Sequence, residues 1–245
     1  MKIIEKPERY YYFEYSAVLI LVLTVLLIAA LSQLNRTKGI EAFAQPVTKK
    51  IVVVDAGHGG WDPGAISGST EEKGINLLIA RKLQSYLELG GAYVLMTRTE
   101  DEALGASKSS DMRQRRSITN GMSADILVSV HQNSFSSPGA SGAQAFYYKD
   151  SPRSQLLADC IQKYFVSDLS TKRGGESKGN TSYYVLRHTT VPSVIVECGF
   201  ISNYSEKKRL LSDDYQEKVA WAIYKGIVDY FQQEDTAPSG KGGAS

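Results

Sequence analysis

The sequence has little cysteine and little excess charge, and both shortages exclude classes of protein. Only two cysteines, Cys160 and Cys198, occur in 245 residues, too few for a small secreted domain held together by disulfides. Both are expected to be buried thiols. Lys and Arg together number 28 against 26 Asp and Glu, a net charge of +2, which argues against a nucleic-acid partner. With 42% hydrophobic residues, the chain can form an ordinary globular core.

Long apolar stretches are also scarce, and just one stands out. Residues 15–35 contain no charged side chain, and as a helix they would cross the roughly 30 Å core of a bilayer. Residues 42–44, Ala-Phe-Ala, have the small-x-small pattern of a signal-peptidase site. The segment is therefore predicted to be an uncleaved membrane anchor or a signal that is removed after Ala44. Either alternative predicts an extracytoplasmic location, membrane-anchored or secreted.

Changes in composition predict three parts of the chain. Residues 1–46 form the membrane anchor or signal segment with a linker, and residues 47–234 form one globular domain. Residues 235–245, rich in glycine and serine, are predicted to be a disordered tail.

The domain is predicted to be of the α/β class. Residues 51–54 are a β-branched run typical of a strand buried on both faces of a parallel sheet, and residues 73–89 have apolar side chains at helical spacing. Further strands and helices are expected to alternate: strands near 92–96, 126–130, 143–148, 183–186 and 193–196, and helices at 111–122, from 151, and near 215–231. Residues 174–179 are expected to form a flexible loop. The alternation predicts a single three-layer domain whose mostly parallel sheet is flanked by helices.

Side chains capable of metal or acid–base chemistry follow three of the predicted buried strands. They are His58, His131 and Glu197, and the carboxyl ends of parallel strands meet at one edge of a sheet. Glu71 and Glu72 precede the first helix, whose start faces that same edge. Two imidazoles and one carboxylate are a ligand set of catalytic zinc, and a second carboxylate can accept a proton. The residues alone leave the choice between Glu71 and Glu72 open.

Four short motifs occur in order along the domain. They are DAGHGG followed by DPGA at 55–65, Glu72-Lys73 at a helix start, SVHQN at 129–133, and PSVIVECGFISN at 192–203. Together they resemble the zinc-dependent N-acetylmuramoyl-L-alanine amidases. The resemblance extends from about residue 51 to 231, with mild departures such as Ala56 where proline is common in the family.

The resemblance implies site residues and a reaction. Zn²⁺ would be held by His58, Glu72 and His131, so the family pattern selects Glu72 over Glu71, and Glu197 would be the catalytic carboxylate. The reaction implied is hydrolysis of the amide bond between N-acetylmuramic acid and L-alanine in peptidoglycan, which removes stem peptides.

Two further residues are candidates for substrate binding. Asn133, two residues after His131, can form a hydrogen bond with the substrate or with a residue that supports the metal ligands. Alternatively, it serves only in a turn. Arg187 can meet a stem-peptide carboxylate or form a surface ion pair. Cys198 follows Glu197 and by strand alternation should point to the opposite face. A cysteine hydrolase using Cys198 with His131 is a rival interpretation, although no helix N-terminus is at hand to activate the thiol.

The short N-terminal anchor and bare catalytic domain resemble membrane-anchored amidases of endospore formers that act on spore cortex, toward muramic lactam. This implies a forespore or cortex location. The alternatives are a vegetative or division-associated cell-wall amidase and a zinc peptidase acting within the stem peptide. Because a bare domain has no wall-binding repeat, an anchor or a protein activator must supply effective concentration. Residues 103–110 and 171–182 are candidate docking loops.

Overall fold

The computed structural model describes residues 18–28, 45–137, 139–169 and 175–236. The chain divides into two compact units, Met1–Ala44 and Gln45–Ser245. In the first unit, residues 18–28 are helical. None of the helices in the described ranges is both long and apolar enough to cross a bilayer. The remainder of the predicted 15–35 segment and the predicted cleavage motif at 42–44 lie outside the described residues.

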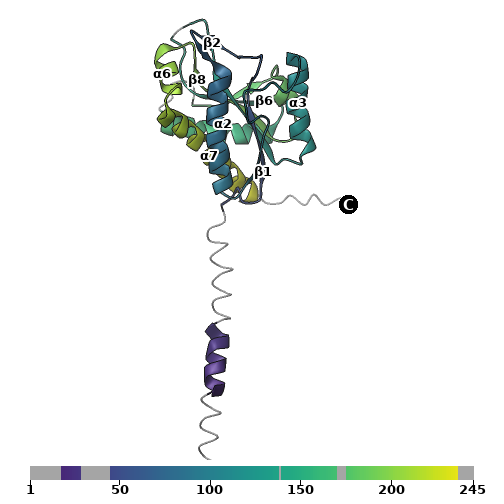
Figure 1. The fold of residues 1–245 in the computed structure, drawn as a ribbon, viewed down its shortest axis with the longest axis vertical. Helices are drawn as coiled ribbons and strands as arrows, with labels where there is room; N and C mark the ends of the chain where they lie inside the picture. The colour runs from purple at the N-terminus through teal and green to yellow at the C-terminus, as the bar shows by residue number, and fades with distance from the viewer. Residues whose placement is uncertain (1–17, 29–44, 138, 170–174, 237–245) are drawn as a thin grey trace, which may run out of the picture. The chain divides into compact units, whose positions relative to one another are not determined.

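The second unit is built on a six-stranded sheet (Figure 1). Its strand order is β4 (Tyr93–Met96), β1 (Ile51–Ala56), β5 (Ile126–Asn133), β8 (Ser193–Phe200), β6 (Gln144–Tyr148) and β7 (Lys178–Asn180). The first four strands are parallel, β6 is antiparallel to β8, and β7 is parallel to β6. The predicted α/β class with a mostly parallel sheet is confirmed.

Helices cover both faces of this sheet. The large core packs under α2 (Glu72–Leu89), α4 (Pro152–Leu169) and α7 (Asp213–Thr236). A smaller apolar cluster lies on the other face, beside α3 (Lys108–Gly121) and α5 (Tyr184–His188). Figure 1 shows α2 and α7 on one side of β1 and α3 on the other. A short hairpin of β2 (Ile66–Ser67) and β3 (Thr70–Glu71) precedes α2, and α6 (Tyr204–Leu210) follows β8.

Burial on both faces explains why the strands have no polar alternation. In β1, Val52 and Val54 belong to the large core, whereas Val53 belongs to the smaller cluster together with Leu127 and Val185. Successive side chains of a strand point to opposite faces. A strand covered by helices on both sides is therefore apolar throughout.

Two local predictions about the α3 and α5 region were wrong. Of residues 183–186, predicted as a strand, Tyr183 is the N-cap of α5 and the other three belong to that helix, because so short an apolar run fits a buried helical turn as well as a strand. The helix predicted to start at Asp111 starts at Lys108, and its N-cap is Ser107, whose hydroxyl accepts from the Ser110 amide. Asp111 instead accepts a hydrogen bond from the buried Arg115 at 2.6 Å.

Val47, the first residue of the predicted domain, is fully buried in the core. Regular structure extends further than the sequence indicated at two places. The expected loop at 174–179 contains the start of β7 at Lys178. The final helix continues to Thr236, into the predicted tail. Residues 237–245 lie outside the described ranges.

Candidate active site

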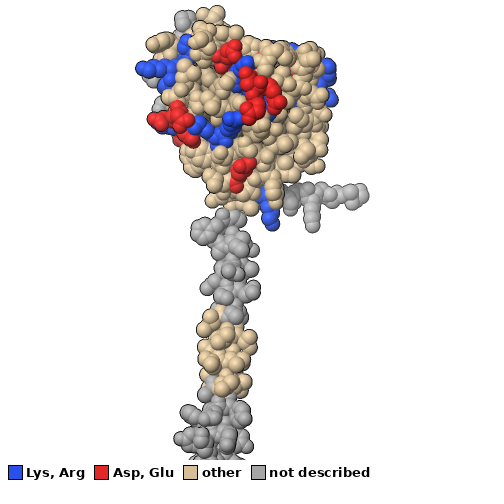
Figure 2. Space-filling view, in the orientation of Figure 1, with Lys and Arg blue, Asp and Glu red and all other residues tan. Residues whose placement is uncertain are grey.

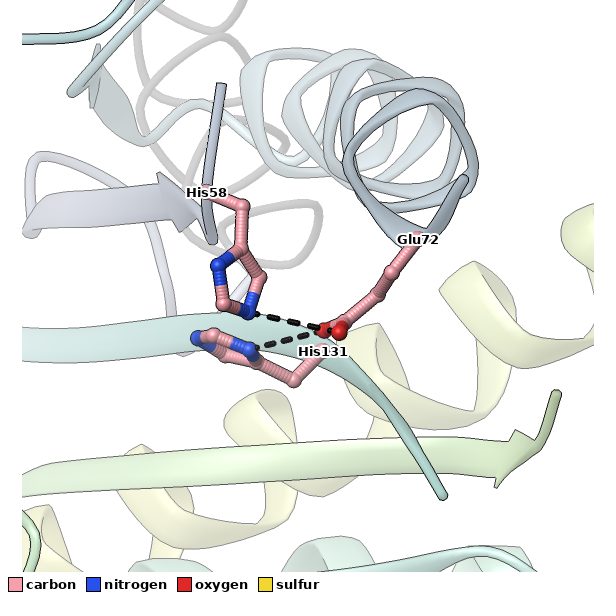
Figure 3. Close-up of side chains that lie close together, drawn as sticks. All are labelled: His58, Glu72 and His131. Atoms are coloured by element: carbon pink, nitrogen blue, oxygen red, sulfur yellow. Dashed lines mark hydrogen bonds and ion pairs between the residues drawn. The ribbon is translucent and has the colours of Figure 1, made fainter. Parts of the chain in front are cut away.

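His58, Glu72 and His131 converge at the carboxyl edge of the sheet (Figure 3). Each offers one ligand atom, and these three atoms all lie within 4.8 Å of one another. Glu72 stands between the two imidazoles: its Oε2 is 3.3 Å from His58 Nε2 and its Oε1 is 3.0 Å from His131 Nδ1. His58 follows β1, Glu72 is the first residue of α2, and His131 lies within β5. Three separate elements thus bring the donors together.

Two buried arginines fix the loop that carries His58. Arg115 donates to Asp55 Oδ1 at 2.6 Å and to the peptide oxygens of Ala56 and His58 at 2.9 and 2.8 Å. Arg98 also donates to the Ala56 oxygen, at 2.8 Å. His58 itself has a positive φ of 62°, a conformation that costs a non-glycine residue free energy. The dense hydrogen bonding around the loop holds it there.

Two glycines make room for the ligand side chains. A Cβ at Gly57 would overlap the imidazole of His131. A Cβ at Gly64 would lie 2.5 Å from Glu72 Oε2, and Gly64 also has a φ of +67°. Only glycine avoids both the overlap and the left-handed strain. Gly57 and Gly64 are thus required by the packing of the ligand side chains.

The Glu72 carboxylate is held by donors behind the site. The Ala65 amide donates to Oε2 at 2.8 Å, while the Gln132 amide and Asn76 Nδ2 each donate to Oε1 at 3.1 Å. Burial works against the charge, but hydrogen bonds with His131 and His58 hold the pKa of Glu72 well below its usual range. Glu72 is therefore a preoriented anion.

His58 is oriented by a second carboxylate. Its Nδ1 lies 2.8 Å from Asp62 Oδ2, which leaves Nε2 directed at Glu72. Burial lowers the pKa of His58, but the bonds to Glu72 and Asp62 outweigh burial and raise it. A carboxylate behind an imidazole is the usual arrangement that fixes the tautomer and orientation of a metal-binding histidine.

Glu197 lies beside this cluster on the neighbouring strand. It is the register partner of His131, is 8% exposed, and its buried Oε2 has no hydrogen-bond partner within the described chain. Burial raises its pKa to about 7, opposed by the nearby charge of His131 and supported by that of Glu72. A carboxyl with a pKa near neutrality can both accept and donate a proton in a catalytic cycle.

These residues line one cavity of about 280 Å³. The cavity residues missed in the sequence are aromatic and charged: they include Tyr183, Tyr184, Lys108 and Arg115. The two tyrosines come from α5 and the residue before it, where the sequence was read as a strand. No spacing pattern linked them to the motifs.

The predicted strand ends also need correction. His131 and Glu197 were expected just after their strands, but β5 continues to Asn133 and β8 to Phe200. The side chains are consequently neighbours across two strands, on the face that carries α5, rather than members of loops.

The remaining candidates lie outside this cavity. Asn133 lines a second, smaller cavity, and Arg187 is exposed on α5 and lines neither cavity. Glu71 is exposed and pairs with Lys73 at 3.3 Å. Cys198 is buried in the large core on the opposite face from Glu197, as predicted, and burial raises the pKa of its thiol. Its position rules out the cysteine-hydrolase interpretation.

Comparisons with known proteins identify the family. Residues 52–229 match the N-acetylmuramoyl-L-alanine amidase family. The chain belongs to this family. A germination-specific N-acetylmuramoyl-L-alanine amidase of Bacillus subtilis (strain 168) is 35% identical over 215 residues, covering 84% of this chain and 90% of the relative. The resemblance found in the motifs is confirmed, and the protein is an amidase.

Solved structures agree with the fold of this amidase. The CwlD amidase of Clostridioides difficile, solved in complex with the GerS lipoprotein, superposes with a TM-score of 0.73 at 39% identity, covering 75% of this chain and 99% of that chain. The catalytic domain of CwlV from Bacillus (Paenibacillus) polymyxa var. colistinus gives 0.67 at 35% identity, covering 75% and 98%.

Proposed function

We propose that this amidase uses Zn²⁺ held by His58, Glu72 and His131 to hydrolyse the bond between N-acetylmuramic acid and L-alanine. The observation that carries the proposal is the convergence of two imidazoles and one carboxylate within 4.8 Å. The donor set is that of catalytic zinc sites. The glycines at 57 and 64, where a Cβ would strike the ligand side chains, fit a site built around these three donors.

Zinc, when bound, supplies Lewis acidity that polarises a carbonyl and makes water a stronger acid. Glu197, which lines the cavity, accepts the proton of the attacking water and passes it to the leaving amine of L-alanine. Asp62 holds His58, and Asn76 with two backbone amides holds Glu72. Preorientation of this kind removes the cost of arranging the groups during the reaction.

The substrate is proposed to be spore cortex peptidoglycan, on the way to muramic lactam. The germination-specific name of the Bacillus subtilis relative supports this. Vegetative or division-associated wall is the second candidate, because relatives named as probable cell wall amidases from Staphylococcus epidermidis are 33% identical. A zinc peptidase acting within the stem peptide is the third.

One experiment separates these proposals. Full-length protein is incubated with cortex and with vegetative peptidoglycan, and the products are analysed by mass spectrometry. We expect intact stem peptides beginning with L-alanine, released faster from cortex. Equal or faster release from vegetative wall would contradict the cortex assignment, and fragments cut inside the peptide would contradict the amidase reaction at this site.

Location and partners are also proposed. Residues 1–46 anchor or export the domain, and a protein recruiter acts together with the anchor; the Clostridioides difficile amidase was solved with a lipoprotein bound. Figure 2 shows acidic and basic side chains mixed over the drawn face of the second unit. Recovery of the full-length protein in the cytosolic fraction would contradict the anchor.

A further inference from the structure

A second cavity of about 140 Å³ lies beside the catalytic one. Its lining includes Asn133, Phe135, Gln144, Phe146, Lys178 and Phe200. Register partners on neighbouring strands point to the same face of a sheet: Gln144 lies opposite Glu197, and Phe146 lies opposite Lys178. The Phe146 ring meets Tyr183 edge-on, with ring centroids 5.6 Å apart, and Tyr183 lines the catalytic cavity. The two cavities therefore share an aromatic wall.

Lys178 provides an uncompensated positive charge in the second cavity. Its side chain is exposed, and it forms no ion pair with any residue of the described ranges. Some other lysines have an acidic partner: Lys163 pairs with Asp229 at 2.8 Å, and Lys108 of the catalytic cavity interacts electrostatically with Asp62. The ammonium group of Lys178 is thus available to an anion from outside the chain.

The chemistry of the proposed substrate indicates which anion this is. In the scissile bond the lactyl carboxyl of muramic acid is consumed as an amide, so the N-acetylated glycan beside it carries no charge. The free carboxylates of the substrate all lie on the stem peptide, beyond L-alanine. A lone cation next to apolar ring surfaces therefore complements the peptide side of the bond and not the glycan side.

We propose that the second cavity is the stem-peptide subsite, in which Lys178 binds a peptide carboxylate and Phe146 packs against the peptide chain. This inference rests on the proposed function. It makes Lys178 a specificity-determining residue that distinguishes free from amidated stem peptides.

The spacing of the strands suits a short peptide. Lys178 is two strands and two residues away from Glu197 in the register, which places their Cα positions about 12 Å apart. An extended peptide covers about 3.3–3.6 Å per residue, and the lysine side chain shortens the remaining gap. The carboxylate of the second or third stem residue is therefore the one within reach.

The test is a cycle of substrate and protein changes on the full-length enzyme. Three soluble N-acetylmuramoyl tripeptides are compared, with all carboxyls free, with the second-residue carboxyl amidated, or with the third-residue carboxyl amidated. For the wild type we expect one of the two amidations to lower kcat/KM about fivefold, the effect of a partly exposed ion pair. In Lys178→Met the same amidation should have no effect.

Lys218→Met is the matched control. Lys218 is an exposed lysine on α7, across the sheet from both cavities, so its variant should keep the wild-type preference. An amidation preference that persists in Lys178→Met, or a wild type indifferent to both amidations, would overturn the subsite. Failure of the wild type to cleave any of the three substrates would instead overturn the proposed function, and the subsite with it.

Discussion

Replacing Glu197 by Gln is predicted to lower the amidase rate and to raise the stability of the metal-free protein. The amide has nearly the same shape but cannot accept a proton, so the amidase rate should fall by about 10² to 10⁴. Zinc should still bind, since Glu197 is not one of the three converging donors. The metal-free protein, however, should become more stable at alkaline pH.

The magnitude follows from the burial of Glu197. Its pKa is raised from 4.5 to about 7 in the folded protein, and each pKa unit corresponds to about 1.4 kcal/mol. The folded state therefore disfavours the charged carboxylate by about 3 kcal/mol. A raised carboxyl pKa destabilises the fold as the group ionises: the penalty is absent below pH 4.5, grows up to pH 7 and is complete above it. Glu197→Gln removes this penalty.

The assay is urea unfolding of the full-length protein with a chelator present, followed by tryptophan fluorescence at pH 8 and pH 5. We expect the variant to exceed the wild type by about 3 kcal/mol in unfolding free energy at pH 8 and by far less at pH 5. Glu71→Gln is the control, because Glu71 is exposed and faces Lys73; it should keep both activity and stability. Wild-type turnover in Glu197→Gln, or a stability difference independent of pH, would refute this account of the base.

Three further outcomes are expected. Single Ala variants of His58, Glu72 and His131 should lose zinc, measured by metal analysis of the purified protein, while circular dichroism still reports the α/β fold; stoichiometric zinc in all three would contradict the ligand assignment. Asp62→Asn should weaken zinc binding about 10- to 100-fold in a competition titration, because the partner that orients His58 is lost. Unchanged zinc affinity would show that Asp62 does not orient His58 for metal binding. Cys198→Ala should retain amidase activity, since the thiol is buried in the core on the far face, and loss of turnover in a folded variant would reopen a role for it.

Patterns set by short-range physics were predictable from the sequence. The β-branched run at 51–54 indicated a strand covered on both faces, and β1 is buried that way. Because parallel strands end at one edge of a sheet, the sequence predicted that His58 and His131 lie close together. The ligand role of His58, Glu72 and His131 stays a prediction, although their donor atoms converge. The role of Glu197 as the base also stays a prediction.

Features decided by long-range packing were not predictable. Arg98 and Arg115 hold the loop of His58 from 40 and 57 positions along the chain, and an isolated arginine has no pattern that reveals a buried partner. The short helix α5 was read as a strand because five residues are too few to show a period. Tyr183, which lines the catalytic cavity and contacts Phe146 of the second cavity, was missed for the same reason.

The buried Asp55–Arg115 pair illustrates why this part of the site depends on the whole fold. Burial alone would raise the pKa of Asp55, yet Arg115 and the hydroxyls of Ser129 and Thr97 outweigh it and lower the pKa to about 2. An ion pair buried this deeply contributes little net stability to the fold, but removal of one partner destabilises the protein by about 3–5 kcal/mol. Arg115 also donates to the His58 peptide oxygen. A shift of the loop that carries His58 would therefore disturb the buried ion pair and incur part of this free-energy cost. The position of His58 therefore depends on a charge pair of which the motif around His58 supplies only Asp55, because Arg115 comes from the distant helix α3.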